Sequence, residues 1–140
     1  MTSLEQIENP KVKTVDSLFS DKIPEIIGID YDLWTLRAIL SFSIAEQIVE
    51  KRIYIIFKNI VGFRVLDEGN LLEFWNPDTR ASGWLWEVEK GGWLDLEKLR
   101  HGFVEGYHEN EYRKEFLVLG QNNCLSIITN SAPIIIDSEE

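Results

Sequence analysis

The stretch "KRIYIIFKNIVGFRVL" at residues 51–66 is a run of sixteen residues with strong β-sheet character. Ile53, Ile55 and Phe57 fall on one side of an extended chain, because successive side chains of a strand point to opposite faces. Sixteen residues are many for one straight strand, and Gly62 offers a bend or a bulge. The stretch therefore predicts two strand segments that meet near Gly62.

Apolar side chains alternate with polar ones in other regions as well. Residues 31–44 predict a half-buried strand, and residues 112–120 and 123–129 predict two strands joined at "GQNN". A glycine followed by asparagines between apolar runs is typical of a hairpin. From this alternation we expect a core that contains Trp34, Leu36, Leu40, Phe42, Ile55, Phe57, Phe116, Val118 and Ile127.

The tryptophan-rich stretch "SGWLWEVEKGGWL" at residues 82–94 is compatible with two local structures. As a strand, it would place Trp84, Trp86 and Val88 on one face. As a helix, it would begin at the cap residue Ser82 and end at Gly91, which suits a left-handed position after a helix. We favour the helix over residues 82–90, because it explains both of these flanking residues.

The helical interpretation gives Trp86 a particular place. Trp84, Leu85 and Val88 would form the apolar stripe of such a helix, and Trp86 would point away from it, four residues before Lys90. Tryptophan is enriched in the residues that dominate the binding energy of protein interfaces. Trp86 is therefore a candidate for an exposed interface anchor.

These patterns predict an α+β fold with a single domain over residues 1–140. We expect an antiparallel β-sheet of about four to six strands with one or two short helices packed on one face. Residues 1–25 form a lead-in segment in this prediction, and residues 137–140 form a frayed acidic tail.

Charge and cysteine content narrow the possible partners and the compartment. The 14 basic and 24 acidic residues give a net charge of −10, which repels nucleic acid and anionic membranes and attracts basic proteins. The sequence shows no leader pattern and no long apolar segment, and it contains one cysteine. We therefore expect a cytoplasmic protein.

No combination of residues makes a convincing catalytic or metal site. His101 and His108 lie near Glu105 at helix-like spacing, but Gly102 and Gly106 argue for a plain loop. Cys124 sits in an apolar run, where a lone cysteine usually packs as a small hydrophobic residue. The sequence thus predicts no catalytic residues, no metal and no cofactor, and it does not point to an enzyme.

Three stretches carry a resemblance to a known class of protein: "GFRVLDEGNLLEFW", "GGWLDLE" and "EFLVLGQNNCLSIITNSAPII". They resemble a group of small bacterial cytosolic proteins. The expected order of an early strand pair, a short helix and a closing hairpin is similar to that in some immunity proteins of polymorphic and contact-dependent toxin systems. The resemblance covers residues 30–136 and transfers no functional residue to a position in this chain. It implies a compact acidic module that binds and blocks a cognate toxin.

We therefore expect a non-enzymatic protein-binding module, with a basic toxin protein as the partner. Trp86 is the candidate anchor, and Asp30, Asp32, Glu109 and Glu111 are candidates for an acidic rim around it. A small structural domain that forms homo-oligomers through an exposed strand is the alternative, and a small-ligand binder or an enzyme is a lesser one.

Overall fold

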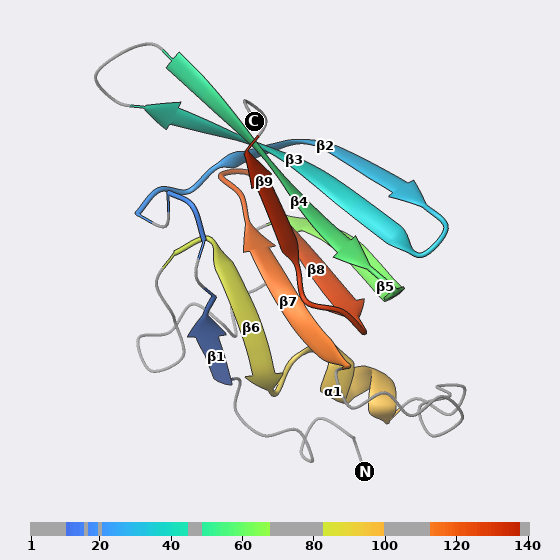
Figure 1. The fold of residues 1–140 in the computed structure, drawn as a ribbon. Helices are drawn as coiled ribbons and strands as arrows, with labels where there is room; N and C mark the ends of the chain where they lie inside the picture. The colour runs from blue at the N-terminus through green and yellow to red at the C-terminus, as the bar shows by residue number, and fades with distance from the viewer. Residues whose placement is uncertain are drawn as a thin grey trace.

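Two antiparallel β-sheets that face each other make up most of the fold (Figure 1). Strands account for 67% of the residues that the structure describes, so the fold is richer in β-structure than the α+β prediction. The antiparallel sheet character itself is confirmed. The computed structural model describes residues 11–15, 17–19, 21–44, 49–67, 83–99 and 113–137.

One sheet has five strands and includes most of the C-terminal half of the described chain. Its strands, in spatial order, are β1 (Lys11–Thr14), β6 (Leu85–Lys90), β7 (Lys114–Leu119), β8 (Asn123–Thr129) and β5 (Ile60–Asp67). The turn between β7 and β8 contains the "GQNN" sequence, so the predicted hairpin is confirmed.

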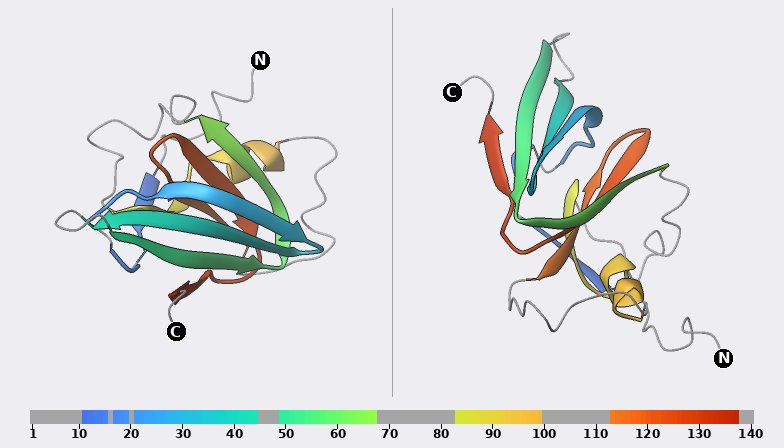
Figure 2. Two further views of the ribbon diagram at one scale, coloured as in Figure 1. Left: turned by 90° about the horizontal axis from the view of Figure 1, so that it is seen from above. Right: turned by 90° about the vertical axis from the view of Figure 1, so that its right-hand side faces the viewer.

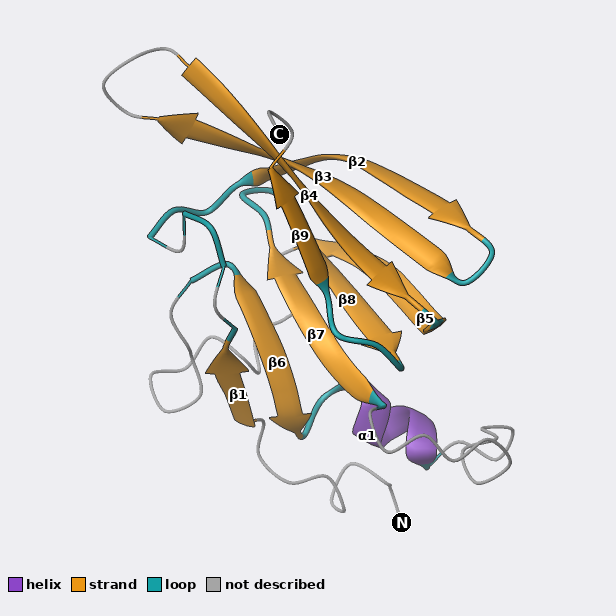
Figure 3. Ribbon diagram, viewed as in Figure 1, coloured by secondary structure: helices purple, strands orange, loops and turns teal. Residues whose placement is uncertain are grey.

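The other sheet has four strands and lies opposite the first (Figure 2). Its spatial order is β2 (Glu25–Asp32), β3 (Thr35–Ile44), β4 (Val49–Lys58) and β9 (Ile134–Asp137). The helix α1 (Trp93–Lys98) lies at the start of β7, where Figure 3 shows it below the five-stranded sheet.

The chain passes from one sheet to the other three times, between β1 and β2, between β4 and β5 and between β8 and β9, and the last two passages lie next to each other. Asn59, with a positive φ of 56°, separates β4 from β5, and residues 130–133 separate β8 from β9. The amide group of Asn59 donates to Ser131 Oγ at 2.5 Å, and Thr129 Oγ1 donates to the carbonyl of Lys58 at 2.6 Å. The predicted split of residues 51–66 is therefore confirmed, but the chain turns at Asn59, and Gly62 lies beside a bulge inside β5.

The core lies between the sheets and is rich in aromatic rings. The rings of Phe57 and Phe116 meet across the sandwich with centroids 5.8 Å apart. Trp84 packs edge-on against Phe42 at 5.7 Å and donates its indole N–H to the carbonyl of Leu18 at 2.8 Å. Eight of the nine predicted core residues are buried here: Leu36, Leu40, Phe42, Ile55, Phe57, Phe116, Val118 and Ile127.

The predicted helix over residues 82–90 is wrong. Leu85–Lys90 is the strand β6, which pairs with β1 on one side and with β7 on the other. Both faces of this strand are buried at Leu85 and Trp86, so apolar residues follow one another as they would on a helix. Gly91 does adopt a positive φ of 78°, but it turns the chain from β6 toward α1.

The prediction that Trp34 belongs to the core is also wrong. Residues 31–44 form the end of β2, a two-residue turn at Leu33 and Trp34, and then β3. Trp34 keeps 65% of its surface exposed because it stands at the turn, where the alternation of a strand does not apply.

Both end segments set apart in the sequence contribute residues to the sheets. The lead-in segment contributes Lys11–Thr14 as β1, which pairs with β6. Asp137, which was assigned to the frayed tail, pairs with Ile53 in the β4–β9 ladder and forms an ion pair with Lys51 at 2.7 Å. Residues 138–140 lie outside the described ranges.

Candidate functional site

The turn between β2 and β3 exposes two large apolar side chains side by side. Leu33 is 75% exposed and Trp34 is 65% exposed. Both have a positive φ, 30° for Leu33 and 73° for Trp34. Two-residue hairpin turns with two positive φ angles favour Asn-Gly, because a bulky side chain is strained there. Leu33 and Trp34 thus lower the stability of the fold in two ways: their backbone is strained, and their apolar side chains stay in water.

The turn is held in place by the neighbouring sheet. The carbonyl of Trp34 accepts a hydrogen bond from the backbone N–H of Ile60 at 2.9 Å, at the start of β5. Two residues before Leu33, the Tyr31 ring packs against the Phe63 ring of β5 with centroids 5.3 Å apart. The exposed pair therefore stands on a fixed support, which reduces the entropy cost of binding.

Two of the predicted rim acids lie beside this turn. Asp30 and Asp32 are exposed on β2, just before Leu33. Asp30 forms an ion pair with Arg37 at 2.5 Å, so its charge is largely balanced locally. Glu109 and Glu111, the other predicted rim acids, lie outside the described residues.

The predicted exposure of Trp86 is wrong. Trp86 is fully buried on β6, on the face of the five-stranded sheet that points away from the other sheet. A buried ring offers no surface to a partner, so Trp86 is not an interface anchor. The tryptophan that the sequence assigned to the core, Trp34, occupies the exposed position instead.

The acidic charge of the chain is unevenly distributed with respect to the fold. The described ranges contain 12 basic and 12 acidic residues. The remaining 2 basic and 12 acidic residues, and with them the whole net charge of −10, lie outside those ranges. The described sandwich is therefore close to electrically neutral.

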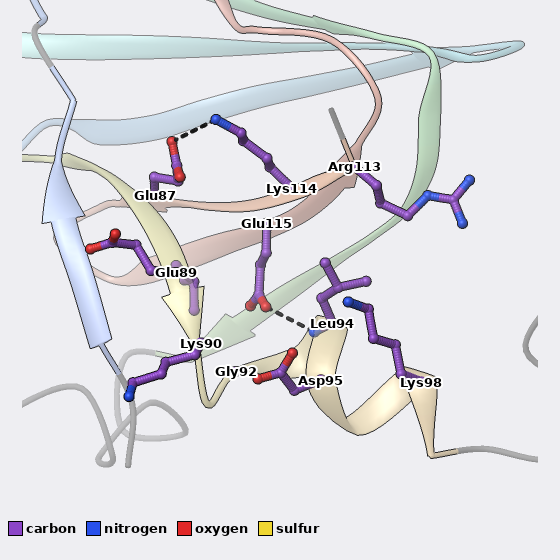
Figure 4. A pocket seen from close by; sticks show the side chains of 11 residues that line it. Glu87, Glu89, Lys90, Gly92, Leu94, Asp95, Lys98, Arg113, Lys114 and Glu115 are labelled. Atoms are coloured by element: carbon purple, nitrogen blue, oxygen red, sulfur yellow. Dashed lines mark hydrogen bonds and ion pairs between the residues drawn. The ribbon is translucent and has the colours of Figure 1, made fainter. Parts of the chain in front are cut away.

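A polar pocket of about 270 Å³ opens between β6, α1 and the start of β7 (Figure 4). Four acidic and four basic side chains line it: Glu87, Glu89, Asp95, Glu115, Lys90, Lys98, Arg113 and Lys114. Three of the acids already have partners. Glu87 lies within 3.8 Å of Lys13 and 3.6 Å of Lys114, and Asp95 accepts the N–H of Gly91 at 2.7 Å.

Glu115 is the third acid, and its role in the pocket is structural. Its side chain descends from β7 onto the first turn of α1 (Figure 4), where its carboxylate accepts the N–H groups of Leu94 at 2.8 Å and Trp93 at 3.2 Å. The first N–H groups of a helix lack partners within the helix, and the helix dipole favours negative charge there. Glu115 therefore caps α1 from a neighbouring strand.

Burial dominates the protonation of Glu115. The side chain is 1% exposed, and this desolvation raises the pKa of Glu115 to about 6 from the usual 4.5. The two backbone N–H groups and the charge of Arg64 lower the pKa in opposition, and the charge of Asp95 raises it further. Sequence reasoning missed this residue, although a glutamate inside the apolar run "EFLVLG" was a visible signal.

Side chains that could bind a metal ion or act as a nucleophile are the remaining candidates among the described residues. Among them, no group of three or more histidine, cysteine, aspartate or glutamate side chains is placed to hold a metal ion. Cys124 is buried in β8, as the sequence predicted. His101 and His108 lie outside the described ranges.

No protein-family model, curated protein or solved structure matches the chain. No helix in the described part of the chain has the length and apolar character needed to cross a membrane.

Proposed function

We propose that the protein is a non-enzymatic binding module that holds a partner protein through the β2–β3 turn. The observation that carries this proposal is the exposed pair Leu33–Trp34 at positive φ, supported by the hydrogen bond from Ile60. Residues held in sparsely populated backbone conformations often mark binding sites. A large indole ring at a fixed position is also typical of the residues that dominate interface energy.

The strained β2–β3 turn also lowers the stability of the free protein, and a bound partner would offset this loss. A left-handed conformation costs roughly 1–2 kcal/mol for a residue other than glycine. Burying an exposed tryptophan against a partner recovers roughly 2–3 kcal/mol of hydrophobic free energy. A partner with an apolar cavity that receives Trp34 would therefore offset the cost of the strained turn.

Charge indicates the kind of partner. The net charge of −10 speeds the approach of a basic protein, while lasting affinity depends on the desolvated apolar centre. With the resemblance to immunity proteins, this supports a basic cognate toxin as the partner, bound in the cytoplasm. The same charge opposes binding to nucleic acid and to anionic membranes.

The experiment uses the product of the gene adjacent to the one that encodes this chain. The purified native chain and the Trp34→Ala variant are compared for binding to that product at low and at high salt. We expect Trp34→Ala to raise the dissociation rate roughly thirtyfold, since a central aromatic is worth about 2 kcal/mol. Added salt should slow association of both proteins.

Leu96→Ala is the matched control. Leu96 is an exposed leucine on α1, so its replacement also removes exposed apolar surface but leaves the β2–β3 turn intact. Equal binding by the native chain, Trp34→Ala and Leu96→Ala would overturn the proposal, as would the absence of binding by the native chain.

A further inference from the structure

The edge strands β2 and β5 belong to different sheets and lie on the same side of the sandwich (Figure 1). Ladder register places Ile29 and Tyr31 of β2 on the face that looks toward the other sheet, and it places Phe63 and Val65 of β5 likewise. The rings of Tyr31 and Phe63 lie 5.3 Å apart and join the two strands. We call these four residues the side strip.

Solvent reaches the side strip. Tyr31 is 50% exposed and Val65 is 48% exposed, while Ile29 and Phe63 are half-buried and pack against the core. Tyr31 stands two residues before Leu33, so the strip continues the exposed apolar surface of the β2–β3 turn. A contiguous apolar surface of this kind is typical of a site that binds another protein.

The opposite edge of each sheet has charged side chains at inner positions. Asp137 of β9 is on the inner face and pairs with Lys51 at 2.7 Å. Lys13 of β1 lies 3.8 Å from Glu87, its ladder partner on the inner face of the other sheet. Inward-pointing charges are one way in which proteins protect a sheet edge from other chains. The four positions of the side strip are apolar instead, which suits them to contact with a partner.

The strands that carry the side strip are acidic. They contain four acidic residues and one basic residue: Glu25, Asp30, Asp32, Asp67 and Arg64. Asp30 is balanced by Arg37, and Arg64 points to the face of its sheet opposite the strip. Glu25 and Asp32 are exposed at the two ends of β2. A basic partner would therefore meet favourable charge at both ends of this edge.

The charges next to these strands leave that sign unchanged. Asp21 and Lys22 precede β2 and balance each other. Lys58 is on β4, and Thr35 stands between it and Asp32 in the ladder. The net charge of −10 on the whole chain acts in the same direction.

We infer that the side strip is part of the surface that binds the basic partner, and that it receives a segment of that partner in which apolar side chains lie between lysine or arginine residues. The inference rests on the proposed function, because one partner would occupy both the turn and the strip. The apolar side chains of the segment cover Tyr31 and Val65, and its basic side chains approach Glu25 and Asp32. An interface with an apolar centre and an oppositely charged rim gives both lasting affinity and fast association.

The first test compares two substitutions that change the charge equally. Val65→Lys places a cation on the side strip, and Ile136→Lys places one at a similarly exposed position on β9. Binding of both variants and of the native chain is measured against the product of the adjacent gene. We expect Val65→Lys to raise Kd roughly tenfold or more, through repulsion and lost apolar contact, and Ile136→Lys to stay within about twofold of the native chain.

The second test leaves the apolar surface intact. Glu25→Lys reverses a charge at the end of β2 that lies farther from the turn in the sequence, and Glu89→Lys makes the same change at an exposed glutamate on β6. We expect Glu25→Lys to slow association severalfold more than Glu89→Lys at low salt, and this difference to vanish at high salt. Unfolding midpoints are measured for all four variants, and where Val65→Lys does not fold, the glutamate pair decides.

The outcomes separate this inference from the proposed function. Weaker binding by Trp34→Ala, with equal affinities for Val65→Lys and Ile136→Lys and equal association rates for Glu25→Lys and Glu89→Lys, would overturn the side strip and leave the turn as the binding site. Native binding by Trp34→Ala with weak binding by Val65→Lys would support the strip and overturn the turn. A native chain that does not bind would overturn both.

Discussion

At the scale of single residues, the main contrast is between side chains that the fold buries and one that it leaves exposed. Trp86 and Glu115 are buried on the same face of the five-stranded sheet, and Trp34 stands in solvent at a turn. Glu115 is a buried carboxylate that stabilises α1 through two backbone N–H groups. Its placement makes the stability of the protein sensitive to pH.

The pH dependence follows from the direction of the Glu115 shift. The folded protein binds this proton more tightly than the unfolded chain, because the pKa of Glu115 is raised from 4.5 to about 6. The resulting stability is present below pH 4.5 and is lost as the pH rises through about 6. A shift of this size corresponds to about 2 kcal/mol.

Glu115→Gln isolates this contribution, because glutamine keeps an acceptor oxygen for Leu94 but does not titrate. We expect the difference in unfolding free energy, Glu115→Gln minus native, to rise by about 2 kcal/mol between pH 4 and pH 8. Denaturant unfolding at a series of pH values measures it. Parallel pH profiles for the two proteins would show that Glu115 does not titrate in this range.

At the scale of elements, sequence reasoning identified β3 from its alternation and β7 and β8 from the turn between them, and it failed at β6. The alternation in Leu36, Leu40 and Phe42 identified β3 correctly. In β6 both faces are buried, so the period of two disappears and flanking residues Ser82 and Gly91 suggested a helix. The prediction for Trp34 failed because this residue continues the alternation of β3 in the sequence. In the structure Trp34 belongs to the turn that precedes β3, so the alternation does not bury it.

The junction between β6 and α1 depends on a glycine. A Cβ atom at Gly92 would lie 2.7 Å from Glu115 Oε1 and 2.7 Å from Val88 Cγ1. We expect Gly92→Ala to lower the unfolding free energy by roughly 1–3 kcal/mol, because neither the capping carboxylate nor β6 can move without loss of contacts.

Gly62→Ala is the control for this junction. A Cβ atom there meets the Trp93 ring at 3.4 Å, which is close to ordinary contact. Thermal unfolding of both variants makes the comparison. Equal melting temperatures for Gly92→Ala and the native chain would show that the space beside Glu115 is less restricted than the structure indicates.

At the scale of the whole molecule, the sandwich supplies a neutral, tightly packed support, and the net negative charge lies outside the described ranges. The two crossings at Asn59 and residues 130–133 lock the sheets together on one side. The total charge could be predicted from composition, but the neutrality of the described ranges could not, because it depends on which residues form the two sheets.

The shared core predicts that the sheets unfold together. Phe116 is 1% exposed, and its ring meets Phe57 of the other sheet. We expect Phe116→Ala to cost about 3–5 kcal/mol, which is a large part of the stability of an ordinary domain. Chemical denaturation should show one transition at a lower midpoint. A variant with the native midpoint would contradict the assigned core.

The proposal that Leu33 and Trp34 serve binding is tested most directly by the unfolding free energy of the double variant Leu33→Asn, Trp34→Gly. This variant gives the β2–β3 turn the residues that two positive φ angles favour, and it removes the exposed apolar pair. If the native pair is kept for a partner at the expense of folding, the variant should be more stable than the native chain by roughly 1–2 kcal/mol. A variant that is less stable than the native chain would contradict this, because Leu33 and Trp34 would then be required by the fold itself.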